Sequence, residues 1–265
     1  MLAARIITAA VFGLAITAAI LLAPPIVTAA VLGLLWLAGA WEWGGLARLD
    51  GMPRFAYAAA LVIAMVVAWR WLDAGGALLL LGVALAWWGA ALVLVLKFPR
   101  SFDPKFVAAA GVLVLVPSWT LLLRLHGAGE LGPKLVFVVL LIVWAADVGA
   151  FVFGRWLGRT KLAPAVSPGK TWEGVGGGVL AAGATAGVAA AVLGLPLGSF
   201  VALGLATAVI SVLGDLTQSM FKRNVGVKDS GRLLPGHGGV LDRIDSLTAA
   251  VPLFALGLFI FGVVS

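Results

Sequence analysis

The sequence of 265 residues contains no cysteine and few charged residues. The absence of cysteine excludes a disulfide framework, a thiolate metal site and a cysteine nucleophile. Charged residues make up 11% of the chain, against roughly 25% in an average soluble domain. So little charge cannot cover a surface that faces water on all sides, and this excludes an ordinary soluble protein.

Long apolar runs take the place of the missing charge. Hydrophobic residues make up 63% of the chain, and the mean hydropathy is +1.15. Each run is long enough to cross the roughly 30 Å hydrocarbon layer of a bilayer. The sequence therefore predicts an all-α, polytopic integral membrane protein with about nine transmembrane helices. The expected segments are 6–23, 26–43, 55–72, 76–96, 105–124, 133–153, 174–194, 198–218 and 245–264.

The first apolar run follows Arg5 and ends at Pro24-Pro25. Its length of about 18 residues exceeds a usual signal-peptide core, so we expect a retained first helix. The chain shows no linker and no internal repeat, which favours one membrane-embedded domain over 1–265. Within it, 1–132 would form N-terminal helices, and 133–265 would form catalytic helices with cytoplasmic loops.

Basic residues are distributed unequally between the alternate connections. If the segments alternate across the membrane, fifteen lysines and arginines fall on one side and only Arg70, Arg124 and Lys134 on the other. The side that is rich in lysine and arginine is normally cytoplasmic. We therefore expect the N-terminus and the basic loops in the cytoplasm and the C-terminus outside. This pattern accounts for the net charge of +7 without nucleic acid as a partner.

Two isolated features have simple interpretations. Trp41, Glu42 and Trp43 end the second segment. Tryptophan is enriched at membrane interfaces, so we interpret this triplet as an interfacial anchor with Glu42 near the head groups. His126 is expected to be solvated in an outer loop.

Three acids lie in or at the ends of apolar segments. Asp147 falls in segment six, Asp215 near the end of segment eight, and Asp242 at the start of segment nine. An acid within a membrane segment costs about 2.5–3.5 kcal/mol on insertion scales and normally has a partner. A helix-packing hydrogen bond would suffice as that partner. If segments eight and nine are neighbours, however, Asp215 and Asp242 can converge. Such a pair suits Mg²⁺, which is commonly held by one or two carboxylates together with substrate phosphates.

The connection between segments six and seven combines Ser167, Lys170 and Thr171 with glycines. Gly169-Lys170-Thr171 resembles the end of a P-loop. Pro164 stands where that motif needs its first glycine, and no strand–helix unit surrounds it, so a Walker A site is not expected. Lysine, hydroxyls and glycine amides in one loop still suit phosphate oxygens.

Segment seven is rich in glycine. Gly174/Gly178 and Gly183/Gly187 form two small-xxx-small pairs, which let helix backbones approach closely. Tight packing within one subunit and a homodimer face are both consistent with these pairs.

The stretch from Ser219 to Asp245 is a polar island between apolar segments. It holds five bases, three acids and one of the two histidines, His237. It reads Ser-x-apolar-Lys-Arg, then four residues, Lys-Asp, and later His-Gly-Gly-x-x-Asp-Arg-x-Asp. A polar island of this kind in a membrane protein is a candidate functional site.

This pattern of 27 residues resembles the signature of the phosphatidate cytidylyltransferase family, the CDP-diacylglycerol synthases. Asp147-Val-Gly-Ala-Phe with Gly154-Arg, and Ser167-Pro-x-Lys-Thr-Trp-Glu-Gly, also look like family motifs. The resemblance covers the chain from about residue 144 onwards. Gly169 lies where the family usually has a second lysine, which removes one cation from the presumed phosphate loop.

The resemblance implies transfer of a cytidylyl group from CTP to phosphatidate, giving CDP-diacylglycerol and pyrophosphate in phospholipid biosynthesis. It implies a bacterial-type inner membrane enzyme, Mg²⁺ as cofactor and room for a second, monovalent cation. The expected catalytic residues are Asp215, Asp242, Lys222, Arg223, His237 and Asp147, the first two as metal ligands. The expected substrate-binding residues are Ser167, Lys170, Thr171, Lys228, Asp229, Arg232, Arg243 and Ser219.

Two other classes of function remain open at this point. A secondary transporter for an anionic solute would use intramembrane acids for ion coupling, but it predicts acids near the midplane and here they lie near one face. A related lipid nucleotidyltransferase or CTP-dependent lipid kinase would share the site and differ in the lipid acceptor.

Overall fold

The computed structural model describes residues 13–231, 233 and 238–264. Helices dominate this part of the chain. After an apolar helix at Gly13–Leu22, the elements are α2 (Pro25–Leu46), α3 (Gly51–Trp71), α4 (Ala74–Leu96), α5 (Pro104–His126), the 3-10 turn η1 (Gly129–Leu131), α6 (Gly132–Leu157), β1 (Lys161–Ala163), β2 (Ser167–Thr171), α7 (Trp172–Leu193), α8 (Leu197–Asn224) and α9 (Leu241–Ile260).

Eight helices in the described part of the chain are long and apolar enough to cross a membrane. They correspond one to one with the second to ninth expected segments, which confirms the prediction of an all-α, polytopic membrane protein. The first expected segment, 6–23, lies partly outside the described residues. Its described part is the short helix Gly13–Leu22, so the count of nine stays a prediction.

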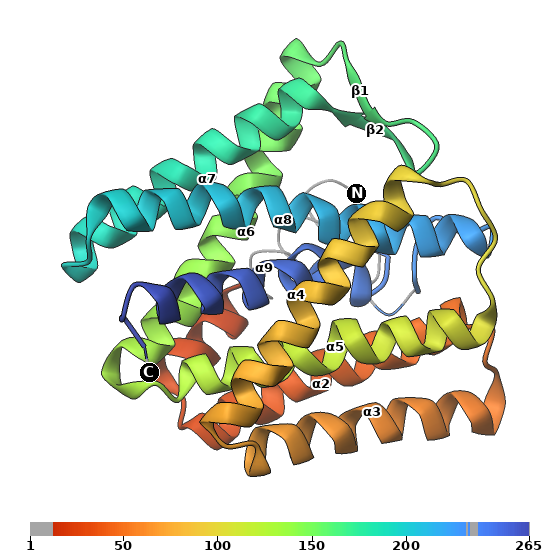
Figure 1. Ribbon diagram of the computed structural model, residues 1–265, viewed down its shortest axis with the longest axis horizontal. Coiled ribbons are helices and arrows are strands. Elements are labelled where there is room, and N and C mark those ends of the chain that lie inside the picture. Colours follow the sequence, from red (N-terminus) through yellow and green to blue (C-terminus); the bar gives the residue numbers. More distant parts are fainter. Residues whose placement is uncertain (1–12, 232, 234–237, 265) are drawn as a thin grey trace.

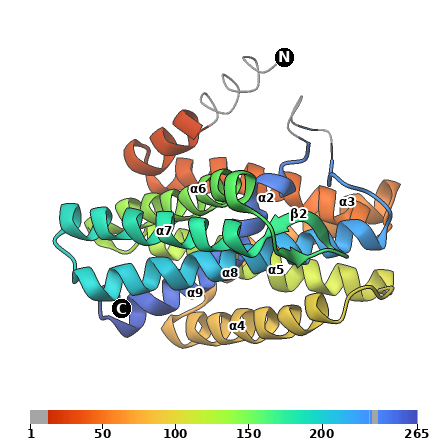
Figure 2. The same cartoon turned by 90° about the horizontal axis from the view of Figure 1, so that it is seen from above.

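The helices form a bundle around α5, α8 and α9. Viewed from above, α4 lies along one side and α2 along the opposite side, with α5, α8 and α9 between them (Figure 2). α6 and α7 form a closely packed pair that packs against α8 (Figure 1). α5 is the most deeply buried of the eight spans, because it touches α2, α3, α4, α6 and α9.

Hydrogen bonds between distant loops show which connections share an end of the bundle. Asn224, at the end of α8, donates to and accepts from the backbone of Phe102 in the α4–α5 connection. Arg223 donates to the Val166 carbonyl in the α6–α7 connection at 3.3 Å. At the opposite end, Arg124 of α5 donates to the Leu72 carbonyl after α3 at 2.7 Å. The expected alternation of loops between two ends is therefore present, and the basic loops gather at one of them.

The glycines of α7 allow close packing within this chain. A Cβ on Gly174 would lie 2.8 Å from the Ala150 carbonyl oxygen of α6, and one on Gly178 would lie 2.5 Å from the Ala146 carbonyl oxygen. A Cβ on Gly183 would meet Leu205 of α8. Both small-xxx-small pairs thus have intramolecular partners, and this packing fixes the α6–α7 pair beside α8.

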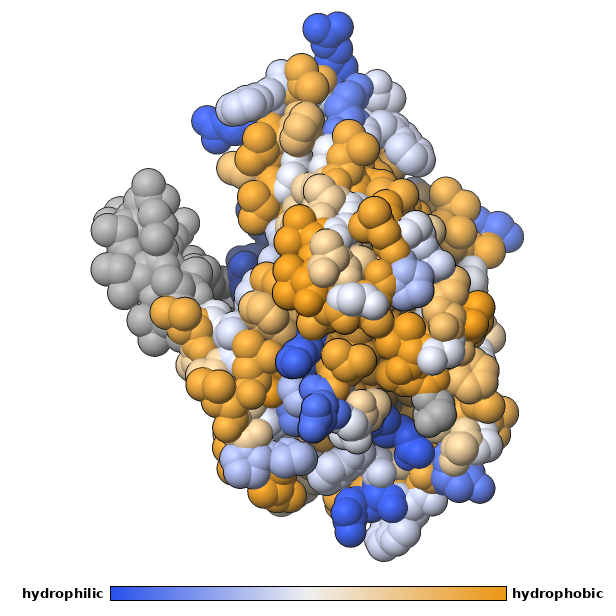
Figure 3. Space-filling model, turned by 90° about the vertical axis from the view of Figure 1, so that its left-hand side faces the viewer, coloured by the Kyte–Doolittle hydropathy of each residue, from blue (hydrophilic) through white to orange (hydrophobic). Residues whose placement is uncertain are grey.

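The surface is consistent with a lipid environment. Apolar residues cover most of the face seen from the left side of Figure 1, and hydrophilic residues form only small patches there (Figure 3). Many large hydrophobic side chains are exposed on the helices, among them Leu34, Ile63 and Val148. In water these residues would be unfavourable, whereas lipid tails solvate them without cost.

The interpretation of His126 as a solvated loop residue is wrong. His126 is the last residue of α5, and only 4% of it is exposed. Its Nε2 lies 2.9 Å from the carbonyl oxygen of Ile20. This contact holds the end of helix Gly13–Leu22 against α5, and a buried carbonyl needs such a partner.

Candidate active site

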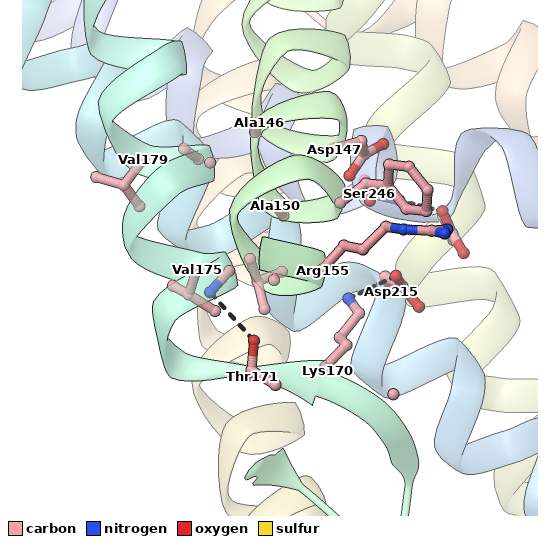
Figure 4. Close-up of a pocket in the computed structure, with 18 of the residues that line it drawn as sticks. Ala146, Asp147, Ala150, Arg155, Lys170, Thr171, Val175, Val179, Asp215 and Ser246 are labelled. Carbon is pink, nitrogen blue, oxygen red and sulfur yellow. Dashed lines mark hydrogen bonds and ion pairs between the residues drawn. The ribbon is translucent and has the colours of Figure 1, made fainter. Parts of the chain in front are cut away.

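A cavity of about 500 Å³ opens at the end of the bundle where the basic loops gather. It lies between α6, α7, α8, α9 and strand β2. Its charged lining consists of Asp147, Arg155, Lys170, Asp215, Asp242, Arg243 and Asp245. The side chains of Asp147, Lys170 and Asp215 point into the same space (Figure 4). Four acids and three bases therefore share one cavity in a molecule that is otherwise poor in charge.

Helical spacing brings the α6 residues to the cavity. Five residues of α6 line it at positions three, four, seven and eight residues after the first: Asp147, Ala150, Phe151, Gly154 and Arg155. Side chains at that spacing share one face of a helix. Gly154 packs against Gly174 of α7. The backbones of the two helices therefore lie close together where they line the cavity.

Strand β2 carries Lys170 to the cavity. β1 and β2 pair antiparallel, with Lys161 opposite Thr171 and Ala163 opposite Ser167. The hairpin was not part of the sequence prediction, which treated this connection as a loop. Lys170 Nζ lies 2.5 Å from Asp215 Oδ2, and Ser219 donates a hydrogen bond to Asp215 Oδ1 at 3.1 Å. The connection between α6 and α7 is thereby joined to the end of α8.

Asp242 is more fully engaged by the protein than Asp215. Lys222 Nζ lies 2.7 Å from its Oδ1, and the backbone amides of Ser230 and Gly239 each donate to its Oδ2 at 3.0 Å. A carboxylate offers about four acceptor positions, and donors among the described residues engage three of them. Asp242 therefore fixes the end of α8 and the loop before α9 while it faces the cavity.

Asp245 and Arg155 also line the cavity, and neither is among the site residues predicted from the sequence. Asp245 lies one helical turn after Asp242, so the i, i+3 spacing could have placed both on one face of α9. It is buried and is within electrostatic range of Asp215 and Asp147. Arg155 could have been found in the same way, two turns after Asp147.

The other predicted residues lie around the cavity in different ways. Arg223 donates to the carbonyl oxygens of Val166 and Val227 and so connects two loops. The Thr171 hydroxyl accepts a hydrogen bond from the Gly174 amide at 3.2 Å and caps α7. The remaining positions are Ser167 at the start of β2, the exposed Lys228 and Asp229, and Arg232 and His237, which lie outside the described residues.

The interpretation of Glu42 as a head-group anchor is wrong. α2 continues to Leu46, and only 1% of Glu42 is exposed. Its carboxylate accepts hydrogen bonds from Ser230, Val240 and Leu241. Sequence alone gave no signal for these contacts, because the partners lie almost 200 residues away along the chain.

The donor set of the cavity fits a hard divalent cation. Carboxylate oxygens are the ligands that Mg²⁺ prefers, and this ion is usually held by one or two carboxylates, with phosphates and water completing its shell. Asp215, Asp242, Asp147 and Asp245 supply such oxygens along one cavity. Within the part of the chain that the structure describes, no three acids or histidines form a complete protein cage. This arrangement suits an ion that arrives with a phosphate ligand.

The fold and this site define a class: a polytopic helical membrane protein with a mixed-charge cavity, suited to phosphate-bearing ligands, at one end of its bundle. The chain belongs to the cytidylyltransferase family, whose model matches residues 3–261. It is 42% identical to a phosphatidate cytidylyltransferase of Haemophilus influenzae, over 98% of this chain and 99% of that protein. Proteins of the same name from Pseudomonas aeruginosa and Brucella suis are 45% and 36% identical, over 84% and 90% of this chain and 84% and 92% of theirs.

Proposed function

We propose that this protein is a phosphatidate cytidylyltransferase of a bacterial inner membrane. It transfers a cytidylyl group from CTP to phosphatidate, and the products are CDP-diacylglycerol and pyrophosphate. The observation that carries the proposal is the cavity of four acids and three bases at one end of an apolar bundle, in a chain of the cytidylyltransferase family. A lipid phosphate and a nucleotide triphosphate can meet there, at the boundary between lipid and water.

The reaction needs alignment and charge neutralisation more than proton transfer. A phosphate oxygen of phosphatidate forms a bond to the α-phosphorus of CTP, and the bond from that phosphorus to the pyrophosphate oxygen breaks. The phosphate monoester is already anionic, so it needs no strong general base. Two anionic substrates repel each other, and fixed positive groups near the reacting atoms reduce this repulsion.

The bases that line the cavity would carry this neutralisation. Lys170, Arg155 and Arg243 come from β2, α6 and α9, so they approach a bound phosphate from three elements. Lys222 holds Asp242 through the ion pair at 2.7 Å, and Arg223 braces the surrounding loops. Lys228, Arg232 and His237 belong to the same loop sequence and would complete the triphosphate site.

We assign Asp215 and Asp242 as the residues that would hold Mg²⁺, with Asp147 and Asp245 adding negative charge around it. When bound, the ion would neutralise phosphate charge and polarise the phosphoryl oxygens. Lys170 contacts Asp215 at 2.5 Å and lines the same cavity, so it would also help to neutralise a substrate phosphate bound there. A second, monovalent cation would be accommodated by the same group of acids.

The test is incubation of the purified protein in detergent with labelled CTP, Mg²⁺ and phosphatidate. We expect a labelled liponucleotide and an equal amount of pyrophosphate. A product that forms only with a different lipid acceptor would point to the related lipid nucleotidyltransferase class. Phosphorylated lipid with release of CDP would indicate a CTP-dependent lipid kinase. Ion-coupled uptake into liposomes without nucleotide turnover would favour the transporter.

A further inference from the structure

Glu42 is a buried carboxylate that the proposed chemistry does not use. It lies on α2, is 1% exposed and does not line the cavity. Its Oε2 accepts hydrogen bonds from the Ser230 hydroxyl and the Leu241 amide, both at 2.8 Å. Its Oε1 accepts one from the Val240 amide at 3.1 Å. Among the described residues, two donors from the loop between α8 and α9 and one from the first residue of α9 thus converge on one side chain of α2.

Asp242 is a second carboxylate that accepts hydrogen bonds from the same loop. Ser230 donates its hydroxyl to Glu42 and its backbone amide to Asp242. On the other side of the loop, Gly239 donates its amide to Asp242, whereas Val240 and Leu241 donate to Glu42. The two carboxylates therefore join residue 230 to residues 239–241.

Two glycines of the loop are matched to the Glu42 carboxylate. A Cβ at Gly231 or at Gly239 would overlap carboxylate atoms of Glu42. Any other residue at these positions would have to displace Glu42 or the loop itself. Such close approach of backbone to a side chain is a common reason for glycine. At Gly239 the added Cβ would also overlap the Ser230 hydroxyl, so both glycines leave room for the contact between Glu42 and Ser230.

The electrostatic setting also favours a fixed anion here. The Val240 and Leu241 amides lie at the start of α9, where free N–H groups and the helix dipole stabilise negative charge. A buried carboxylate is strongly unfavourable unless hydrogen bonds compensate it. Here the Ser230 hydroxyl and the amides of Val240 and Leu241 supply such hydrogen bonds. Glu42 and the loop consequently stabilise one conformation together, and either alone would leave buried polar groups unpaired.

We infer that Glu42 is a positioning residue that fixes Ser230 and residues 239–241 against α2 and so sets the place of Asp242 in the cavity. The inference rests on the proposed function for what the loop binds. It gives the N-terminal helices a defined part in the site, although none of the described residues from 13 to 132 lines the cavity.

Glu42→Gln tests the inference with minimal change of shape. The glutamine NH₂ group must replace one carboxylate oxygen, so it faces the Val240 or the Leu241 amide, donor against donor. Loss of a hydrogen bond to a charged group, together with an unpaired amide, lowers the equilibrium constant for the docked loop by about tenfold or more. We expect peptides spanning 238–242 to exchange amide hydrogen at least about tenfold faster. The apparent KM for CTP should rise by a similar factor, with a smaller change in kcat. Glu130→Gln, the same substitution at an exposed outer site, is the matched control and should change neither.

Ser230→Ala provides a milder variant if Glu42→Gln does not fold. It removes one of the three contacts to Glu42 and should raise the rate of amide hydrogen exchange in peptides that span 228–242. When both variants fold, the double variant should be little worse than Glu42→Gln alone, because the two side chains act through one contact. Fully additive effects would contradict a shared role.

Different measurements test the positioning role of Glu42 and the proposed function. Hydrogen exchange needs no turnover, so unchanged exchange in Glu42→Gln and Ser230→Ala would overturn the inference even in an active enzyme. A lower melting temperature with an unchanged KM for CTP would also overturn it, because it would reduce Glu42 to a purely structural contact. Absence of any liponucleotide product from the wild-type protein would instead remove the proposed function.

Discussion

Asp215 is the side chain on which the proposed chemistry depends most directly. It faces the cavity from α8 and contacts Lys170 of β2 and Ser219. We expect Asp215→Asn to lower turnover by about 100-fold or more, because a metal ligand stabilises several kcal/mol of developing charge. The Mg²⁺ concentration for half-maximal rate should rise as well. Turnover as a function of Mg²⁺ concentration, with pyrophosphate release as the readout, measures both.

Asp242→Asn should affect the rate and the fold together. This carboxylate accepts from Lys222 and from two backbone amides, so its loss leaves a buried lysine unpaired. We expect a lower melting temperature in detergent besides the loss of turnover, whereas Asp215→Asn, whose ion pair is about a quarter exposed, should melt close to the wild type. Near-normal turnover and unchanged Mg²⁺ dependence in Asp215→Asn would remove the proposed metal site.

Gly169 is the position at which the resemblance to the family leads us to expect a second lysine. A Cβ there meets no atom within 4 Å, and the backbone is not in the left-handed region. Gly169 also lines the cavity next to Lys170. We therefore expect Gly169→Lys to fold normally and to bind CTP at least as well as the wild type. A clear rise in the apparent KM for CTP would show that the position needs glycine.

Among the elements, the α6–α7 pair depends most on small residues. A Cβ at Gly178 would lie 2.5 Å from the Ala146 carbonyl oxygen, whereas one at Gly176 would meet no atom within 4 Å. We expect Gly178→Ala to destabilise the fold by about 1–3 kcal/mol through overpacking. Gly176→Ala, on the same helix, should be neutral or slightly stabilising. Thermal unfolding of both variants in one detergent compares them, and equal melting temperatures would contradict the packing argument.

The existence of the helices could be predicted from sequence, but their ends could not. Runs of about 20 apolar residues predict membrane spans by their length alone. Their polar extensions carry no such signal, so the last turn of α8, which bears Lys222 and Arg223, was expected to be loop. Basic residues suit the carboxyl end of a helix, and this preference could have extended α8. The β1–β2 hairpin is three and five residues long, and tertiary contacts rather than sequence pattern define it.

The candidate site could be predicted in part, and its limits follow from distance along the chain. Asp147, Lys170, Asp215, Asp242 and Arg243 were chosen from local motifs, and the structure brings them to one cavity. Asp245 was missed, although helical spacing would have placed it there. Glu42 was misinterpreted because its partners lie in the α8–α9 loop. A single sequence does not show which distant segments touch.

On the scale of the whole molecule, the basic residues are distributed unequally between the two ends of the bundle. The cavity, the hairpin and the basic connections gather at one end, whereas Arg70, Arg124 and Lys134 belong to the other. Positive charge near membrane spans is retained on the cytoplasmic side during insertion. The site would then face the compartment that supplies CTP, while its lipid substrate arrives from the surrounding leaflet.

The orientation can be tested because the natural chain has no cysteine, so each introduced thiol is the only one. Lys228 is exposed in the loop after α8, and Gly198 is exposed at the start of α8, at the opposite end of that helix. In intact cells we expect a membrane-impermeant thiol reagent to label Gly198→Cys but not Lys228→Cys until the membrane is opened. Ser265→Cys, which lies outside the described residues, should be labelled like Gly198→Cys if the chain crosses nine times.

Labelling of Lys228→Cys from outside would reverse the orientation and place the site away from CTP. Labelling of Ser265→Cys only after the membrane is opened would contradict the nine-helix topology.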